Sequence, residues 1–113
     1  MSPKHALLKV VYEAFNARDI ERALSGLHRD VEWANGMEGG SVQGPNAVRD
    51  YWTRQWRLID PRVHPEHYEG EGDQVVINVH QVVCDLEGRI ISDQMVRHSF
   101  EFADELIKVF KIL

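Results

Sequence analysis

The sequence has little that would cross-link a chain or anchor it in a membrane. Its 113 residues include one cysteine, Cys84, so no disulfide can form within the chain. The first residues carry charges at regular intervals, and no long apolar run follows them. A secretory signal segment and a membrane-spanning helix are therefore not expected. We expect a soluble, cytoplasmic protein with no membrane contact.

Basic side chains are also scarce. Thirteen Lys and Arg residues stand against eighteen Asp and Glu residues, which gives a formal net charge of −5. A nucleic-acid partner needs a concentrated basic surface, so none is expected. Four glycines fall within residues 36–44, but they form neither of the glycine patterns that cradle phosphates. No nucleotide or other cofactor is expected.

The remaining composition is that of a globular protein, with 43% hydrophobic and 27% charged residues. A chain of this length suits one domain, over residues 1–113, with one core and no need of metals or disulfides.

The first half of the chain reads mainly as helix. Ser2 and Pro3 form a typical helix start, and apolar residues recur at helical spacing as far as Phe15. Asp19 is positioned to cap a second helix that Gly26 ends. Residues 31–33 predict a short strand, residues 36–44 a loop, and residues 45–59 a third helix. Asp60 and Pro61 end that helix.

The second half reads as a meander of strands over residues 62–69, 74–84, 89–102 and 106–113. Helices, a strand, a helix and then strands indicate the α+β class. We expect a cone-shaped, curved, mixed or antiparallel sheet wrapped by the three helices of the N-terminal half.

The register of the two longest strands decides which side chains face inward. A turn at residues 85–88 places Val75 opposite His98 and His80 opposite Asp93. One face is then mainly aliphatic, with Gln94 and His98 among its few polar members, and we expect it to be the concave face. A slip of one residue would invert this assignment.

Three segments carry a family resemblance: "YEAFNARDIERAL", "LHRDVEW" and "GGSVQGPNAVRDYW". The late segment "MVRHSFEFADELIKVFKI" resembles the closing hairpin of the same family, with Glu105 at the usual glycine of the turn. Together they resemble the SnoaL-like, ketosteroid-isomerase-like branch of the nuclear transport factor 2-like superfamily. The resemblance covers nearly the whole chain. It implies a bent sheet of the cystatin-like α+β barrel type with a cavity at its wide end.

Transfer of catalytic residues from ketosteroid isomerases mostly fails. Trp33 stands at the position of the aspartate base, and Val11 at that of the oxyanion-hole tyrosine, with Tyr12 expected on another helix face. His98 stands at the position of the oxyanion-hole aspartic acid. Without the base, ketosteroid-isomerase chemistry is not expected, nor can the Asp–Arg–Asp set of limonene epoxide hydrolases be assembled.

His98 is the candidate catalytic residue, because an inward histidine can act as an acid, a base or an oxyanion donor near neutral pH. The alternative is a buried histidine that only bonds the protein. Candidate ligand-binding residues are mainly aromatic or amide side chains that would line or cap the cavity: Trp33, Asn35, Trp52, Trp56 and Gln94. For the tryptophans, plain core packing is the competing interpretation.

Two other histidine groups invite chemistry. His80 and Asp93 would form the catalytic dyad if the sheet faces were inverted, and otherwise a surface or interface pair. His64 and His67 lack a third ligand at a diagnostic spacing, so no metal site is expected.

The outer sheet face carries Val76, Val82, Ile91 and Met95, to which the last strand should add Phe110 and Ile112. Exposed apolar area of this kind usually marks an interface, and relatives commonly dimerise here, so we expect a homodimer.

Two functions follow from these expectations. The first is a pocket for a small hydrophobic ligand, in the form of a cofactor-free isomerase, dehydratase or cyclase acting on a hydrophobic or polyketide-like substrate through His98. The alternative is a dimeric interaction or ligand-sensing module with no catalytic activity. A cavity below about 300 Å³ would favour the alternative.

Overall fold

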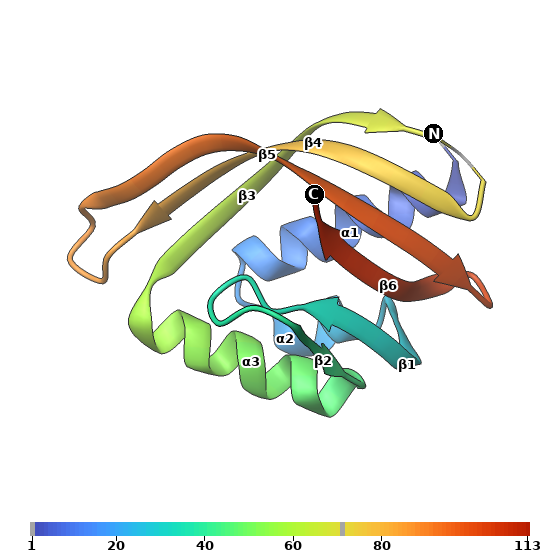
Figure 1. The fold of residues 1–113 in the computed structure, drawn as a ribbon, viewed down its shortest axis with the longest axis horizontal. Helices are drawn as coiled ribbons and strands as arrows, with labels where there is room; N and C mark the ends of the chain where they lie inside the picture. Colours follow the sequence, from blue (N-terminus) through green and yellow to red (C-terminus); the bar gives the residue numbers. More distant parts are fainter. Residues whose placement is uncertain (1, 71) are drawn as a thin grey trace.

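The computed structural model describes residues 2–70 and 72–113 (Figure 1). The helices of this part are α1 (Pro3–Asn16), α2 (Ile20–Leu24) and α3 (Pro45–Leu58). The strands are β1 (Leu27–Ala34), β2 (Ser41–Gln43), β3 (Asp60–Glu69), β4 (Gln74–Cys84), β5 (Ile90–Ala103) and β6 (Leu106–Ile112). None of these helices combines the length and the hydropathy that crossing a membrane requires.

The helix starts are those that the sequence predicts. The Ser2 hydroxyl accepts a hydrogen bond from the His5 amide at 3.1 Å, and Pro3 occupies the first helical position. A carboxylate oxygen of Asp19 accepts from the Arg22 amide at the start of α2. Gly26 follows α2 at a close approach, because a Cβ there would lie 2.7 Å from a methyl group of Val11.

The six strands form one sheet in the order β2-β1-β6-β5-β4-β3. β1 and β6 run parallel, and the other neighbouring pairs run antiparallel, so the sheet is mixed. It curves over α1, while α3 lies along the opposite side of the space beside β1 and β2 (Figure 1). The expected cone-shaped α+β fold is confirmed, but the sheet is not a closed barrel, since β2 and β3 remain its two edges.

The register of β4 and β5 differs from the prediction by two residues. Ile77 lies opposite His98, and His80 lies opposite Met95. The connecting turn is one residue longer than expected, since Cys84 pairs with Ile90, and a bulge between Val83 and Cys84 adds a second residue. Because side chains alternate along a strand, a shift of two leaves the residues on the sheet side of the bulge, Gln94 and His98 among them, on their predicted face. Ile90, beyond the bulge, pairs with Cys84 instead of Val83 and is exposed.

The prediction for β6 was wrong at two residues. Phe110 and Ile112 face the inside of the sheet, where they border the cavity, rather than the outer face. The cause is a bulge: Glu101 pairs with Val109 but Phe102 pairs with Ile107, so Lys108 is an extra residue. The bulge lets both Ile107 and Phe110 point inward, three positions apart. The sequence also gave no sign of β2, which was expected to be loop.

Candidate functional site

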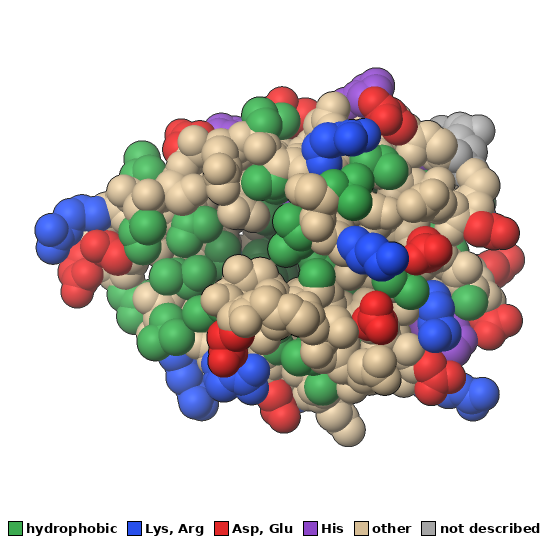
Figure 2. Space-filling model, viewed as in Figure 1, with side chains coloured by type: hydrophobic (Ala, Val, Ile, Leu, Met, Phe, Trp, Pro, Cys, Tyr) green, Lys and Arg blue, Asp and Glu red, His purple; other side chains and the backbone are tan. Residues whose placement is uncertain are grey.

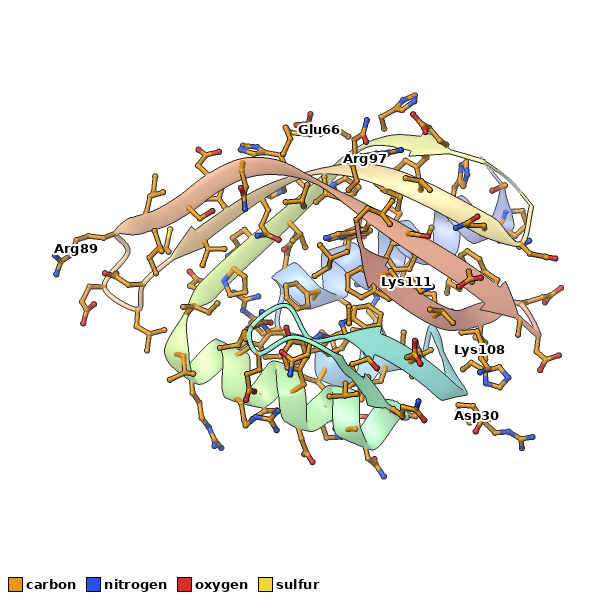
Figure 3. All side chains as sticks on the ribbon, viewed as in Figure 1. Asp30, Glu66, Arg89, Arg97, Lys108 and Lys111 are labelled. Carbon is orange, nitrogen blue, oxygen red and sulfur yellow. The ribbon has the colours of Figure 1, made fainter. Side chains whose placement is uncertain are left out.

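A cavity of about 330 Å³ lies between the concave face of the sheet and helices α1 and α3. In Figure 2, hydrophobic side chains gather around a hollow at the centre of the face shown. No Asp, Glu, Lys or Arg of the described residues borders the cavity, and its polar side chains are Tyr12, Tyr51, Gln55, Gln81, Gln94 and His98. The charged residues labelled in Figure 3 all point away from this space. The cavity is therefore mainly apolar, and its described lining carries no Asp, Glu, Lys or Arg side chain.

Four aromatic rings form the deep wall. Trp33 stacks on Phe110 with ring centroids 4.1 Å apart and meets Trp52 edge to face at 5.3 Å. Phe110 lies 5.1 Å from Phe100. Each of these residues is buried, and each ring is held by at least one other. The wall is therefore rigid, and it presents flat apolar surface to anything in the cavity.

Two polar groups interrupt that wall. The Tyr12 hydroxyl of α1 and Nδ1 of His98 on β5 lie 2.8 Å apart, within hydrogen-bond distance, and both residues border the cavity. Their rings are parallel to within 3°. The Phe110 ring stands edge-on to the imidazole at 4.8 Å. The pair joins the first helix to the centre of the sheet.

Burial keeps both members of this pair neutral. It lowers the pKa of His98 to about 4, because the imidazolium would lose its hydration inside the wall. Burial also raises the pKa of Tyr12 well above its ordinary value, with a smaller contribution from Tyr68. At neutral pH the site therefore holds an uncharged imidazole and an uncharged phenol, joined by one hydrogen bond.

The second ring nitrogen of His98 is neither partnered nor fully enclosed in the described part of the chain. Nε2 has no hydrogen-bond partner in the described part of the chain. It is also not among the fully enclosed, unpartnered side-chain atoms of residues 2–70 and 72–113, which are Gln55 Oε1 and Trp56 Nε1. An unpartnered ring nitrogen in contact with a cavity is available to a ligand as a donor or an acceptor, depending on the tautomer.

A second group of polar residues lies nearer the open end. Gln81 and Gln94 face each other across β4 and β5, and both border the cavity. The Tyr51 hydroxyl accepts a hydrogen bond from the Gly36 amide at 3.0 Å and another from Gln55 Nε2 at 3.4 Å. Buried residues on β5 give way to exposed ones from His98 toward Gln94, so polarity and solvent access increase together.

The structure brings four of the predicted site residues together around the cavity: Trp33, Trp52, Gln94 and His98. Asn35 does not border it. Its side-chain oxygen instead accepts hydrogen bonds from the amides of Met37 and Glu38, which shapes the loop after β1.

Trp56 also lies outside the lining. It packs against Phe15 and Trp52, and the Arg18 guanidinium lies 5.0 Å above its ring. Core packing, the competing interpretation of the tryptophans, therefore accounts for this one.

The alternative dyad lies on the other side of the sheet. His80 Nε2 and Asp93 Oδ1 are 2.7 Å apart, but as diagonal neighbours on the outer face, with both side chains partly exposed. His64 lies beside His80, with ring centroids 6.4 Å apart, and His67 lies near Glu69. Within residues 2–70 and 72–113, no three His, Cys, Asp or Glu side chains are placed to hold a metal ion.

Sequence reasoning missed Tyr12. It was expected on a different helix face from Val11, yet both residues border the cavity. A signal was present: Tyr12 lies in the apolar stripe with Leu8 and Val11. A tyrosine hydroxyl on a buried stripe requires a hydrogen-bond partner.

The chain belongs to the family of SnoaL-like domains, whose sequence profile matches residues 9–110. No curated protein sequence matches it. Among solved structures, TerC co-crystallised with polyporic acid is 28% identical over 99% of this chain and 91% of its own, with a TM-score of 0.89. An NTF2-like protein of unknown function from Burkholderia pseudomallei is 25% identical over 100% and 91%, also with a TM-score of 0.89.

A Mycobacterium tuberculosis protein in complex with estradiol-17β-hemisuccinate has a TM-score of 0.83 and 16% identity over 99% of this chain and 93% of its own. At that identity the likeness concerns the fold alone. The shared fold is the ligand-binding fold of the NTF2-like superfamily.

Proposed function

We propose that this SnoaL-like domain binds a hydrophobic, ring-bearing small molecule and moves a proton on it through His98, without a cofactor. The reaction would be an isomerisation, a dehydration or a cyclisation of a polyketide-like substrate. One observation carries the proposal: an imidazole whose Nε2 has no partner in the described chain lies in the wall of a mainly apolar cavity whose described lining carries no charged side chain. The volume of about 330 Å³ is within the range of small-molecule sites.

The surroundings of His98 keep its imidazole uncharged at neutral pH, and in that form the ring can accept or donate a proton. With its pKa lowered to about 4, the imidazole is unprotonated at neutral pH and offers Nε2 as a base or, in the other tautomer, as a hydrogen-bond donor. A donor fixed in an apolar wall stabilises a developing oxyanion more strongly than the same donor in water. Trp33 and Trp52 would position the ring and exclude water.

The residues that border the cavity also separate this chemistry from that of better-known relatives. No carboxylate lies among the described residues of the lining. By the family resemblance, Trp33 stands at the position of the aspartate base. A mechanism that needs a carboxylate base or nucleophile has no candidate here. Among the described lining residues, His98 and the hydroxyls of Tyr12 and Tyr51 are the groups left to handle a proton.

The test is ligand binding followed through the fluorescence of the cavity tryptophans. Polyporic acid, naphthoquinone and flavone serve as probes, with wild type compared with His98→Leu. We expect micromolar binding of at least one probe and a loss of about tenfold on removal of the imidazole. Gln94→Leu, at the exposed end, is the matched control and should lose less. Absence of binding by all three probes, or equal affinity in wild type and His98→Leu, would contradict the proposal.

A second candidate is a dimeric module without catalysis, and the outer sheet face favours it. Ile91 and Met95 are 59% and 55% exposed there, with Val76 and Val82 partly exposed nearby. We propose that two copies associate through this face. Sedimentation should give a dimer for wild type and a monomer for Met95→Lys. A monomeric wild type would contradict the proposed dimer. Turnover of any probe would contradict a module without catalysis.

A further inference from the structure

Two buried tryptophans in the aromatic wall have indole N–H groups that nothing in the described chain accepts. Trp33 is 7% exposed and Trp52 is 1% exposed, and both border the cavity. The side-chain hydrogen bonds of β1 and α3 in residues 2–70 and 72–113 are made by other residues. A buried indole N–H usually has an acceptor. These two donors therefore lack a partner that the described protein does not supply.

Neither Nε1 atom is fully enclosed. The unpartnered side-chain atoms that are fully enclosed within the described residues are Gln55 Oε1 and Trp56 Nε1. Nε1 of Trp33 and Nε1 of Trp52 therefore keep some accessible surface, although both side chains are almost completely buried. In Trp52 this surface is a share of the 1% that the whole residue exposes. The hollow that both residues border is the cavity.

We propose that the indole N–H groups of Trp33 and Trp52 face the cavity and donate hydrogen bonds to carbonyl oxygen on a flat aromatic ligand. This inference rests on the proposed function of the cavity and names its substrate class, the cyclic aryl ketones. The two tryptophans then recognise a polar group of the ligand in addition to packing against its ring.

The chemistry of an indole N–H selects the kind of oxygen. The group donates and cannot accept, so its partner must carry a lone pair. A ligand hydroxyl could accept the bond, but its own proton would then need an acceptor in an apolar wall. A carboxylate would need a cation, and the described lining holds no Lys or Arg. A carbonyl oxygen has lone pairs and no proton, so it pairs with the donor and leaves nothing unsatisfied.

The arrangement of the rings selects the rest of the ligand. Trp33 stacks on Phe110 with centroids 4.1 Å apart and meets Trp52 edge to face at 5.3 Å. Flat aromatic surfaces of this kind favour a flat aromatic partner. An indole N–H lies in the plane of its ring and at the ring edge. An oxygen that projects from the edge of a planar ligand, as a ring carbonyl does, can reach it while the ligand ring contacts the wall.

The test compares 1-indanone with indane, a matched pair of planar bicyclic probes in which a ring C=O replaces a CH₂ group. Calorimetry on the intact protein measures both affinities. We expect wild type to bind 1-indanone about tenfold more tightly, since indane leaves the donors unpaired. Trp33→Phe or Trp52→Phe should lose this preference. Trp56→Phe is the matched control and should retain it, because Trp56 lies outside the lining and its Nε1 is fully enclosed.

A second measurement uses the wild-type protein and does not depend on the stability of a variant. The chain has three tryptophans, so it gives three indole N–H signals in a ¹⁵N–¹H correlation spectrum. We expect 1-indanone to move the proton signal of Trp33 or Trp52 downfield and to slow its exchange with water, as a new hydrogen bond requires. Indane should do neither, and the exchange of the Trp56 signal should be unchanged by both probes.

Two results separate this inference from the function on which it rests. Equal affinity for the two probes, or a preference for 1-indanone that survives in both Trp33→Phe and Trp52→Phe, would overturn the role of the indole donors and leave ligand binding intact. Failure of both probes, together with failure of polyporic acid, naphthoquinone and flavone, would overturn the proposed function itself.

Discussion

Two histidines on the same pair of strands are placed in opposite environments. His98 faces the concave side of the sheet, is 5% exposed, and has a phenol as its partner. His80 faces the outer side, is partly exposed, and has the Asp93 carboxylate as its partner at 2.7 Å. On sequence alone, the second pair resembles a catalytic dyad more than the first. The comparison teaches that the face of the sheet, and not the residue pair, decides which histidine borders the cavity.

The two faces should differ most in what they contribute to stability. Phe100→Ala removes a ring that is 1% exposed and contacts Trp33 and Phe110, so we expect a loss of about 3–5 kcal/mol in the free energy of unfolding. Met95→Ala, on the outer face, should cost about 0.5 kcal/mol or less in the monomer. Urea denaturation measures both. Similar losses for the two variants would show that the faces are not distinct.

The pH dependence of stability should reveal His98. Its pKa in the folded state, about 4, is below the ordinary value near 6.5, so between these values the unfolded chain binds more protons. Stability contributed by the neutral imidazole is complete above about pH 6.5 and is lost as the pH falls toward 4, by about 3 kcal/mol. As the pH falls across this window, the unfolding free energy of wild type should therefore decrease more steeply than that of His98→Gln. Parallel curves would contradict the buried, neutral state of His98.

The Tyr12 hydroxyl should contribute a smaller amount. Tyr12→Phe leaves Nδ1 of the buried imidazole without its partner, which we expect to cost about 1–3 kcal/mol in unfolding free energy. Tyr51→Phe should cost less, because the Gly36 amide that it leaves unpaired is near solvent. Thermal and urea unfolding of the two variants provide the measurement. A larger loss of unfolding free energy for Tyr51→Phe than for Tyr12→Phe would contradict this contribution of the Tyr12–His98 bond.

The outer pair should matter least. His80→Ala and Asp93→Ala each break an exposed contact between an imidazole and a carboxylate, which water screens, so we expect a change of about 0.5 kcal/mol. Neither change should alter probe binding in the cavity. A double-mutant cycle in low and high salt measures the coupling. Loss of probe binding in either variant would place function on the outer face after all.

Much of the fold was predictable because it follows from local rules. Ser2, Asp19 and Pro45 begin helices where their side chains predict, and the boundaries of β4 agree with the valine-rich segment. The faces of β4 and β5 were predicted correctly although their pairing was displaced by two residues. That error arose in the turn and the bulge beside Cys84, where no residue type indicates that the strand or the turn contains an additional residue.

The candidate site was less predictable because it depends on contacts between distant segments. Gln94 and His98 were predicted from their face of the strand, and Trp33 and Trp52 as aromatic side chains that would line a cavity; all four border it. Tyr12 was missed, since its partner lies 86 positions away along the chain. Phe110 and Ile112 were assigned to the wrong face, because a bulge in β6 changes which residues point inward. Bulges and long-range hydrogen bonds leave little trace in hydrophobic periodicity.

The amino-acid sequence by itself determined the class of the fold, the order of its elements and the apolar character of one sheet face, because capping, periodicity and alternation act between near neighbours. Only the tertiary structure decided that an α1 hydroxyl meets a β5 imidazole in an uncharged wall. That meeting depends on the curvature of the sheet over α1 and on the bulges that set its register. The chemistry of the cavity follows from it, since burial is what keeps His98 neutral.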